Sequence, residues 1–346
     1  GSLTPSIVPL DSTMVIAVVD SVPDIYYTDI SGEYDFQGNT ISGIESFLIS
    51  SCGIEVQDNT GNQIKSNSPE SVLPNVVFSY DETFGNPGNL YYHAKEFRNK
   101  IKVTTALSAG CYYDSTLWEP IIRANFLLSA GVNGSYTPTP NNPGLIKITK
   151  NNGNYSSTLC HEMTHDMVYR SLRNNLFRLG STQETRGAMD EAFSSYFPCV
   201  YRNNSIYRSE YYTKDLQNSL LTVSNVESSS YPLLPVNEEL YGYYHMRFPL
   251  ASAWWALRSN PNFSPTAVNS LLIAGLGIVG RDINYNAAYR YKPRYFYNIL
   301  MRSVDTDNKS WPFNPKQAAI DNMYSDRGFH FYPKVQSVAS ADVTTP

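Results

Sequence analysis

Apolar residues in the first part of the chain form short runs separated by turn-forming residues. Such runs occupy residues 14–19, 73–78 and 144–149, and clusters of Gly, Asn and Pro punctuate the chain between them. Short apolar runs bounded by these residues are typical of strands. The pattern therefore predicts a β-rich segment over residues 11–85, and strands and loops over residues 102–150.

A period of three to four residues marks the predicted helices. Residues 89–101 and 155–169 place apolar side chains at this spacing, the latter with Leu159, Met163 and Met167. Further helices are predicted over residues 182–197, 214–223, 248–258, 266–276, 283–304 and 315–324. We therefore predict an α+β fold. Its β-rich half is residues 1–170, its helical half is residues 171–346, and the helix over 155–169 lies at the junction.

The helix predicted over residues 155–169 contains the motif His-Glu-x-x-His. His161 and His165 are about one helical turn apart, so both imidazoles can bind one cation. Glu162 can reach a water bound to that cation and act as a general base. Two neutral nitrogens and an adjacent base are typical of a catalytic zinc site. The alternative is a pair of ordinary helix histidines, because the motif is short.

A catalytic zinc needs a third protein ligand, for which Glu191 is the best candidate. The short spacing that metzincins use for a third histidine is ruled out, because residues 166–172 contain none. Glu191 lies in a predicted helix among alanine and serine neighbours. Burial of an unpaired carboxylate is costly, and a bound cation removes that cost. Taken alone Glu191 is an ordinary helix glutamate, but the upstream histidine pair makes it the expected ligand.

Residues 187–195, Gly-Ala-Met-Asp-Glu-Ala-Phe-Ser-Ser, resemble a stretch of the thermolysin and fungalysin group of zinc peptidases, the gluzincins. In that group a second helix carries a Gly-Ala-x-Asn-Glu-Ala-x-Ser-Asp-like stretch whose Glu binds zinc. The resemblance implies a thermolysin-like zinc endopeptidase that acts on polypeptides, with zinc bound by His161, His165 and Glu191 and with Glu162 as general base. The acidic clusters that bind calcium in the family are not evident, so calcium has no support from the sequence.

The family also has a late histidine that hydrogen-bonds the tetrahedral intermediate. His245 is the matching residue, just before a predicted helix, and the resemblance implies that it is catalytic. Neither His93 nor His330 has such a context, so both are expected to be structural or exposed.

Three features depart from the family pattern. Ser195 stands where the family has an Asp that orients the first zinc histidine. Because a ligating imidazole needs its other N–H satisfied, we expect Ser195, or a carbonyl or water near it, to meet the free nitrogen of His161. Pro198 should kink or end the helix that carries Glu191. The acidic residue that the family places before the late histidine is not clearly matched.

Composition and charge narrow the choice of partners. A formal net charge of −5 argues against nucleic acid, and no run of about 18 apolar residues indicates a membrane span. The 27 tyrosines and a charged fraction of 16% favour an exported protein, secreted, periplasmic or at the cell surface. Gly1-Ser2 resembles a cloning scar, so a signal peptide could have preceded it.

The cysteines argue against a structural zinc site made of thiolates. Cys52, Cys111, Cys160 and Cys199 form no Cys-x-x-Cys pair. Cys160 and Cys199 lie on the two helices of the predicted zinc site, where they either approach each other or pack as buried free thiols.

The sequence thus predicts a zinc-dependent endopeptidase. The rival hypothesis is a gluzincin-like protein that has lost turnover and binds a polypeptide or glycan. Ser195 favours this rival, whereas the intact motif at residues 161–165 argues against it, because a binding protein has no need of Glu162.

Overall fold

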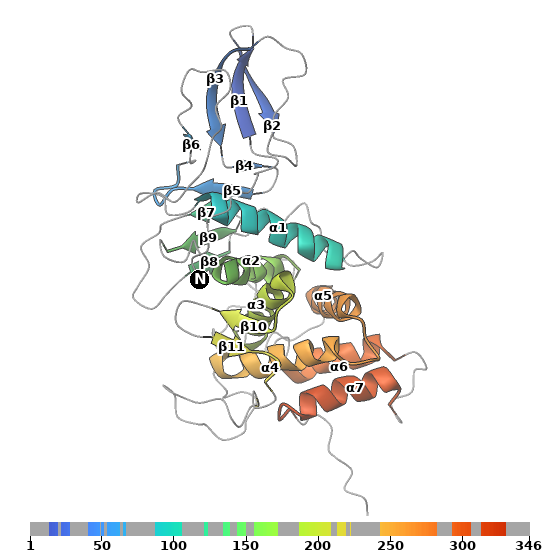
Figure 1. Cartoon of the computed structure of the whole chain (residues 1–346). Helices are drawn as coiled ribbons and strands as arrows, with labels where there is room; N and C mark the ends of the chain where they lie inside the picture. The colour runs from blue at the N-terminus through green and yellow to red at the C-terminus, as the bar shows by residue number, and fades with distance from the viewer. Residues whose placement is uncertain are drawn as a thin grey trace, which may run out of the picture.

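The computed structural model describes residues 14–19, 22–27, 41–48, 50–51, 54–62, 65–66, 87–105, 121–123, 134–138, 144–149, 156–171, 187–208, 213–218, 222, 243–281, 293–305 and 313–329. Within these residues seven helices and eleven short strands form a mixed α/β fold that is mostly helical (Figure 1). The predicted combination of small sheets and helices is confirmed at this level, while the domain boundary at residue 170 stays a prediction. Among the described helices, none has both the length and the hydropathy needed to cross a membrane.

A four-stranded antiparallel sheet lies at one end of the molecule (Figure 1). Its strand order is β2 (Val22–Tyr27), β1 (Met14–Val19), β3 (Ile41–Leu48) and β6 (Lys65–Ser66). Strand β1 coincides with the first predicted apolar run, and the run predicted at residues 73–78 lies outside the described residues.

A five-stranded sheet lies closer to the helices. Its strand order is β4 (Ser50–Ser51), β5 (Ile54–Gln57), β7 (Ile121–Arg123), β9 (Leu145–Ile148) and β8 (Gly134–Thr137). Strands β5, β7 and β9 are parallel, whereas β8 is antiparallel to β9 and is the last described strand on that side of the sheet. Alternate residues such as Ile122, Ile146 and Ile148 are buried, as expected for a sheet with one face against a core. The sheet thereby places β8 beside the helix α2 (Ser156–Ser171).

Helix α2 is the centre of the described core. Leu159, Met163 and Met167 are 0% exposed, which confirms the stripe that their spacing predicts. Helices α1 (Pro87–Thr105) and α3 (Gly187–Arg202) pack against α2, and α4 (Tyr243–Arg258) packs against α3. The remaining helices are α5 (Pro265–Arg281), α6 (Pro293–Ser303) and α7 (Pro315–Ser325). All seven overlap helices predicted from the sequence.

Two local predictions for the second half need correction. Pro198 is predicted to kink or end the helix that carries Glu191, and helix α3 does not end there but continues to Arg202. Burial of neighbours such as Phe197 and Val200 offsets the hydrogen bond that proline cannot donate. The helix predicted over residues 214–223 begins instead as strand β11 (Thr213–Asp215), which pairs with β10 (Ile206–Arg208). Tertiary pairing therefore overrides the local helical pattern there.

A tight turn connects α3 to β10. Asn203 has a φ of 49°, a left-handed conformation that asparagine tolerates better than most residues. The N–H groups of Asn203 and Asn204 donate to the carbonyls of Val200 and Cys199, and the Asn204 side chain accepts from the N–H of Ile206. The turn closes the end of α3 and sends β10 back towards α2, which it contacts.

Candidate metal centre

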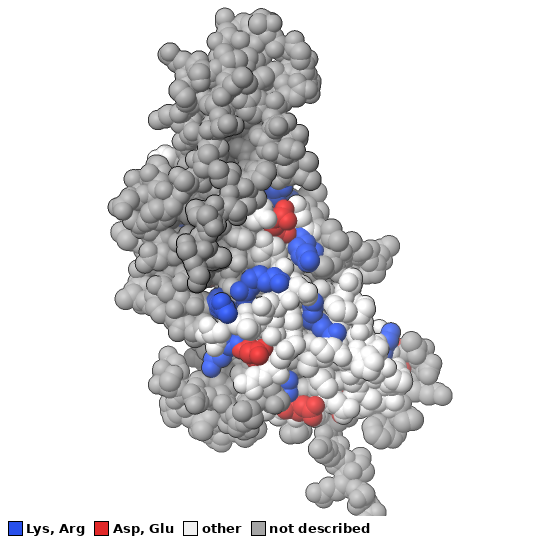
Figure 2. Space-filling model, in the orientation of Figure 1, with Lys and Arg blue, Asp and Glu red and all other residues white. Residues whose placement is uncertain are grey.

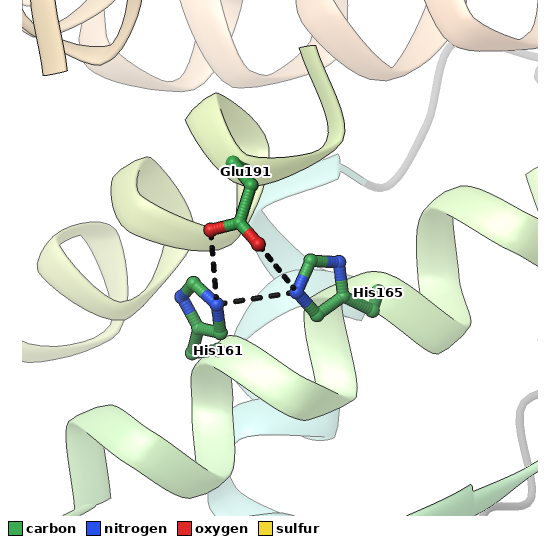
Figure 3. A group of neighbouring side chains, drawn as sticks. All are labelled: His161, His165 and Glu191. Carbon is green, nitrogen blue, oxygen red and sulfur yellow. Dashed lines mark hydrogen bonds and ion pairs between the residues drawn. The ribbon is translucent and has the colours of Figure 1, made fainter. Parts of the chain in front are cut away.

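Helices α2 and α3 bring the three predicted ligands together. His161 and His165 lie one turn apart on α2 with 3.1 Å between their Nε2 atoms, and Glu191 of α3 points between them (Figure 3). The Glu191 oxygens lie 3.4 Å from Nε2 of His161 and 3.7 Å from Nε2 of His165. One ligand atom from each residue falls within 4.8 Å of the other two, so the group could hold one metal ion.

The charges around these residues favour a bound cation. Burial alone would lower the pKa of His165, but the carboxylates of Asp190, Glu191 and Glu162 raise it to about 10. Burial would raise the pKa of Glu191, yet the two imidazoles and Arg247 hold it well below its usual range. Two imidazole nitrogens and one carboxylate are also the donor set of many catalytic zinc sites. The residues present therefore fit a zinc ion in chemistry and in charge.

The outer nitrogen of each imidazole has its own partner. Nδ1 of His161 lies 3.2 Å from the Tyr207 hydroxyl, on β10. Nδ1 of His165 lies 2.9 Å from Oδ1 of Asp190 and 3.1 Å from the hydroxyl of Ser194, both on α3. The prediction that Ser195 meets the free nitrogen of His161 is wrong, because Tyr207 occupies that place and the buried Ser195 hydroxyl has no hydrogen-bond partner among the described residues.

The candidate base Glu162 is covered by strand β8. Its side chain is buried, with the residue only 7% exposed, and burial raises its pKa. A Cβ atom added to Gly134 would lie 2.9 Å from both Cγ and Oε1 of Glu162, so only glycine lets the strand approach this closely. The next inward residue of β8, Tyr136, donates a 2.7 Å hydrogen bond to Asp166 of α2. This bond fixes the position of β8 along the helix.

Arg247 of α4 reaches the same site. Its Nη1 lies 3.2 Å from Oε2 of Glu191, and its guanidinium lies 4.5 Å from the centre of the Phe248 ring. Sequence reasoning gave Arg247 no role because no motif aligns it. Asp190 and Ser194 could have been found as neighbours of Glu191 on one helix, whereas nothing in the spacing of Tyr207 points to His161.

The other predicted residues have different outcomes. His245 lies in the first turn of α4, but its side chain lies outside the described residues, so its catalytic role stays a prediction. His93 is structural as expected, since its Nδ1 lies 2.9 Å from the Tyr201 hydroxyl, and burial lowers its pKa to about 4. Cys160 and Cys199 are buried free thiols, which settles the choice between the two arrangements considered for them.

Comparison with known proteins gives no further indication of function. The chain matches no protein-family model, and a search of the curated proteins finds no similar sequence. The function must therefore be argued from the site itself.

Proposed function

We propose that this protein is a zinc-dependent endopeptidase with a thermolysin-like arrangement of its site. The observation that carries the proposal is the convergence of His161, His165 and Glu191 from two helices, with Glu162 next to the first imidazole in the sequence. A zinc ion held by these three residues would supply a Lewis acid for the scissile carbonyl and lower the pKa of its water.

Glu162 is the proton carrier in this proposal. Its raised pKa favours uptake of a proton from the attacking water, and the same carboxyl then donates to the leaving amine. Cover by β8 keeps Glu162 within the site and away from bulk water. We further propose that His245 stabilises the oxyanion, in line with its place at the start of α4.

An extended polypeptide is the substrate that suits strand β8. Among the described strands β8 is the last of its sheet, and its start lies against Glu162. The unpaired edge of a terminal strand can bind a peptide through backbone hydrogen bonds, which hold an extended chain whatever its sequence. A peptide added to β8 would lie next to the candidate base.

The surface charges agree with a protein substrate better than with a nucleic acid. On the described surface in Figure 2, basic and acidic side chains are interspersed rather than gathered into a basic stripe. The formal net charge of the whole chain is −5. We also propose that the protein is exported, on the basis of its many tyrosines and low charged fraction.

The test is cleavage of casein by the purified chain, with zinc content measured on the same sample. We expect one zinc per chain and cleavage that a chelator abolishes and zinc restores. Glu162→Gln should keep zinc and fold but abolish cleavage, because an amide cannot accept the proton of the water. Glu96→Gln on α1 is the matched control and should cleave as the wild type does.

Two outcomes would contradict the proposal. Absence of zinc from a folded sample supplied with zinc would remove the metal site. Zinc binding without cleavage of casein or a peptide library would favour the rival hypothesis, a protein that only binds a polypeptide or glycan. The sequence support for that rival is weaker than expected, because Tyr207 meets His161 where Ser195 does not.

A further inference from the structure

The two imidazoles of the site differ in what holds their outer nitrogens. Nδ1 of His165 faces the carboxylate of Asp190 and the hydroxyl of Ser194. Among the contacts described above, Nδ1 of His161 faces only the phenol of Tyr207. For Nε2 to bind a cation, Nδ1 must carry the hydrogen and donate it. The Tyr207 hydroxyl is therefore the acceptor that keeps Nε2 of His161 available. For His165 the nearest acceptor is Oδ1 of Asp190, which has no other hydrogen-bond partner among the described residues, and the Ser194 hydroxyl lies beside it.

Tyr207 is fixed in place by the chain that carries Glu191. Helix α3 ends in the turn at Asn203, and the chain returns as β10 with Tyr207 at its centre. The residue is 3% exposed, and its ring packs edge-on against Phe248 at 5.9 Å. A phenol held this rigidly loses little further entropy when it orients an imidazole. Its hydroxyl is thus a built feature of the site rather than a chance contact.

We propose that Tyr207 is the positioning residue of His161, and that Asp190 with its negative charge has this role for His165. The inference rests on the proposed zinc function. A neutral phenol makes a weaker hydrogen bond than a carboxylate, so it holds its imidazole in the ligating orientation less firmly. His161 is then the weaker of the two histidine ligands, and each ring depends on its own partner.

Tyr207→Phe tests the proposal, because it removes the hydroxyl and keeps the ring. We expect zinc affinity, measured by competition with a chelator, to fall about 10–100-fold. Tyr196→Phe is the matched control: Tyr196 is also fully buried, but its hydroxyl donates to Asn269, away from the ligands. The control should bind zinc as the wild type does. Unfolding temperatures of both variants show whether either change acts only through stability.

Nitrogen NMR of the histidine rings gives a second readout that packing alone would not change. In the zinc-loaded wild type, both His161 and His165 should carry hydrogen on Nδ1. Tyr207→Phe should alter only the His161 Nδ1–H signal, and Asp190→Asn only that of His165.

The results separate this inference from the proposed function. If the wild type binds zinc and cleaves casein but Tyr207→Phe has unchanged affinity and an unchanged His161 signal, Tyr207 is only a packing residue. Hydrogen on Nε2 of His161 in the zinc-loaded wild type would also overturn the inference. If the wild type binds no zinc, the proposed function itself is wrong.

Discussion

Gly134→Ala should impair catalysis without removing a single functional side chain. The new methyl carbon would lie 2.9 Å from Cγ and Oε1 of Glu162 and 3.1 Å from Cγ2 of Thr158. Carbon atoms pack at about 3.5–4.0 Å, so either β8 or Glu162 must move by several tenths of an ångström or more. The φ of Gly134 is not in the left-handed region, so added volume rather than backbone strain causes the effect.

The expected losses of folding stability and of turnover in Gly134→Ala both follow from this geometry. Overpacking of this kind commonly costs about 1–3 kcal/mol of unfolding free energy, and the position of β8 at a sheet edge favours the lower part of that range. A displacement near 1 Å of a catalytic group can lower turnover by on the order of 10²-fold. Zinc affinity should stay within a fewfold of the wild type, because Glu162 is not one of the three clustered ligands.

The assay combines steady-state peptide cleavage, zinc content and urea unfolding on one preparation. Gly277→Ala on α5 is the control, because an added Cβ there would meet no described atom within 4 Å apart from the backbone of its own helix; it should keep full turnover and unfold at equal or slightly higher urea. Wild-type kcat and stability in Gly134→Ala would refute the reasoning, since β8 could not then lie against Glu162 as described. Loss of zinc would also count against it.

Three further changes have expected outcomes. His245→Ala should lower kcat by about 10²–10³ with zinc content unchanged, whereas a rise in KM alone would indicate substrate binding instead. Burial lowers the pKa of His93 from 6.5 to about 4, so the unfolded state binds a proton first as the pH falls. Stability should therefore decline between pH 6.5 and 4, by up to about 3 kcal/mol, in urea unfolding; His93→Gln should flatten this decline, and an unchanged profile would contradict the assignment. At Asn203, with φ 49°, alanine should cost about 1 kcal/mol and glycine little in thermal unfolding; equal values would contradict a strained turn.

The sequence predicts those parts of the fold that depend on local periodicity. Leu159, Met163 and Met167 repeat at helical spacing because one face of α2 meets the core, and that requirement is visible in the sequence. The same local logic brings His161 and His165 together. The prediction that Glu191 joins the two histidines required one long-range assumption, that α3 packs on α2. The structure places these two helices in contact.

The parts that could not be predicted depend on contacts between distant segments. Thr213–Asp215 forms a strand because β10 lies beside it, although its own pattern favours a helix. Tyr207 reaches His161 through a turn whose direction depends on one left-handed residue, Asn203. Gly134 looks like an ordinary loop glycine until β8 is placed against Glu162. The spacing of residues along the sequence does not show which distant segments lie in contact.

The path of the chain from α3 into β10 makes a bound cation a reversible cross-link. His161 and His165 belong to α2, Glu191 belongs to α3, and Tyr207 ties the hairpin after α3 to the same imidazole pair. A zinc ion bound by His161, His165 and Glu191 would link α2 to α3 much as a disulfide does. The stability that it adds would depend on the free zinc concentration. At a free zinc concentration about 100 times the dissociation constant, the bound ion would add about 2.7 kcal/mol to the unfolding free energy. For the proposed endopeptidase, resistance to cleavage by other copies of the same protein would then rise and fall with the surrounding zinc concentration.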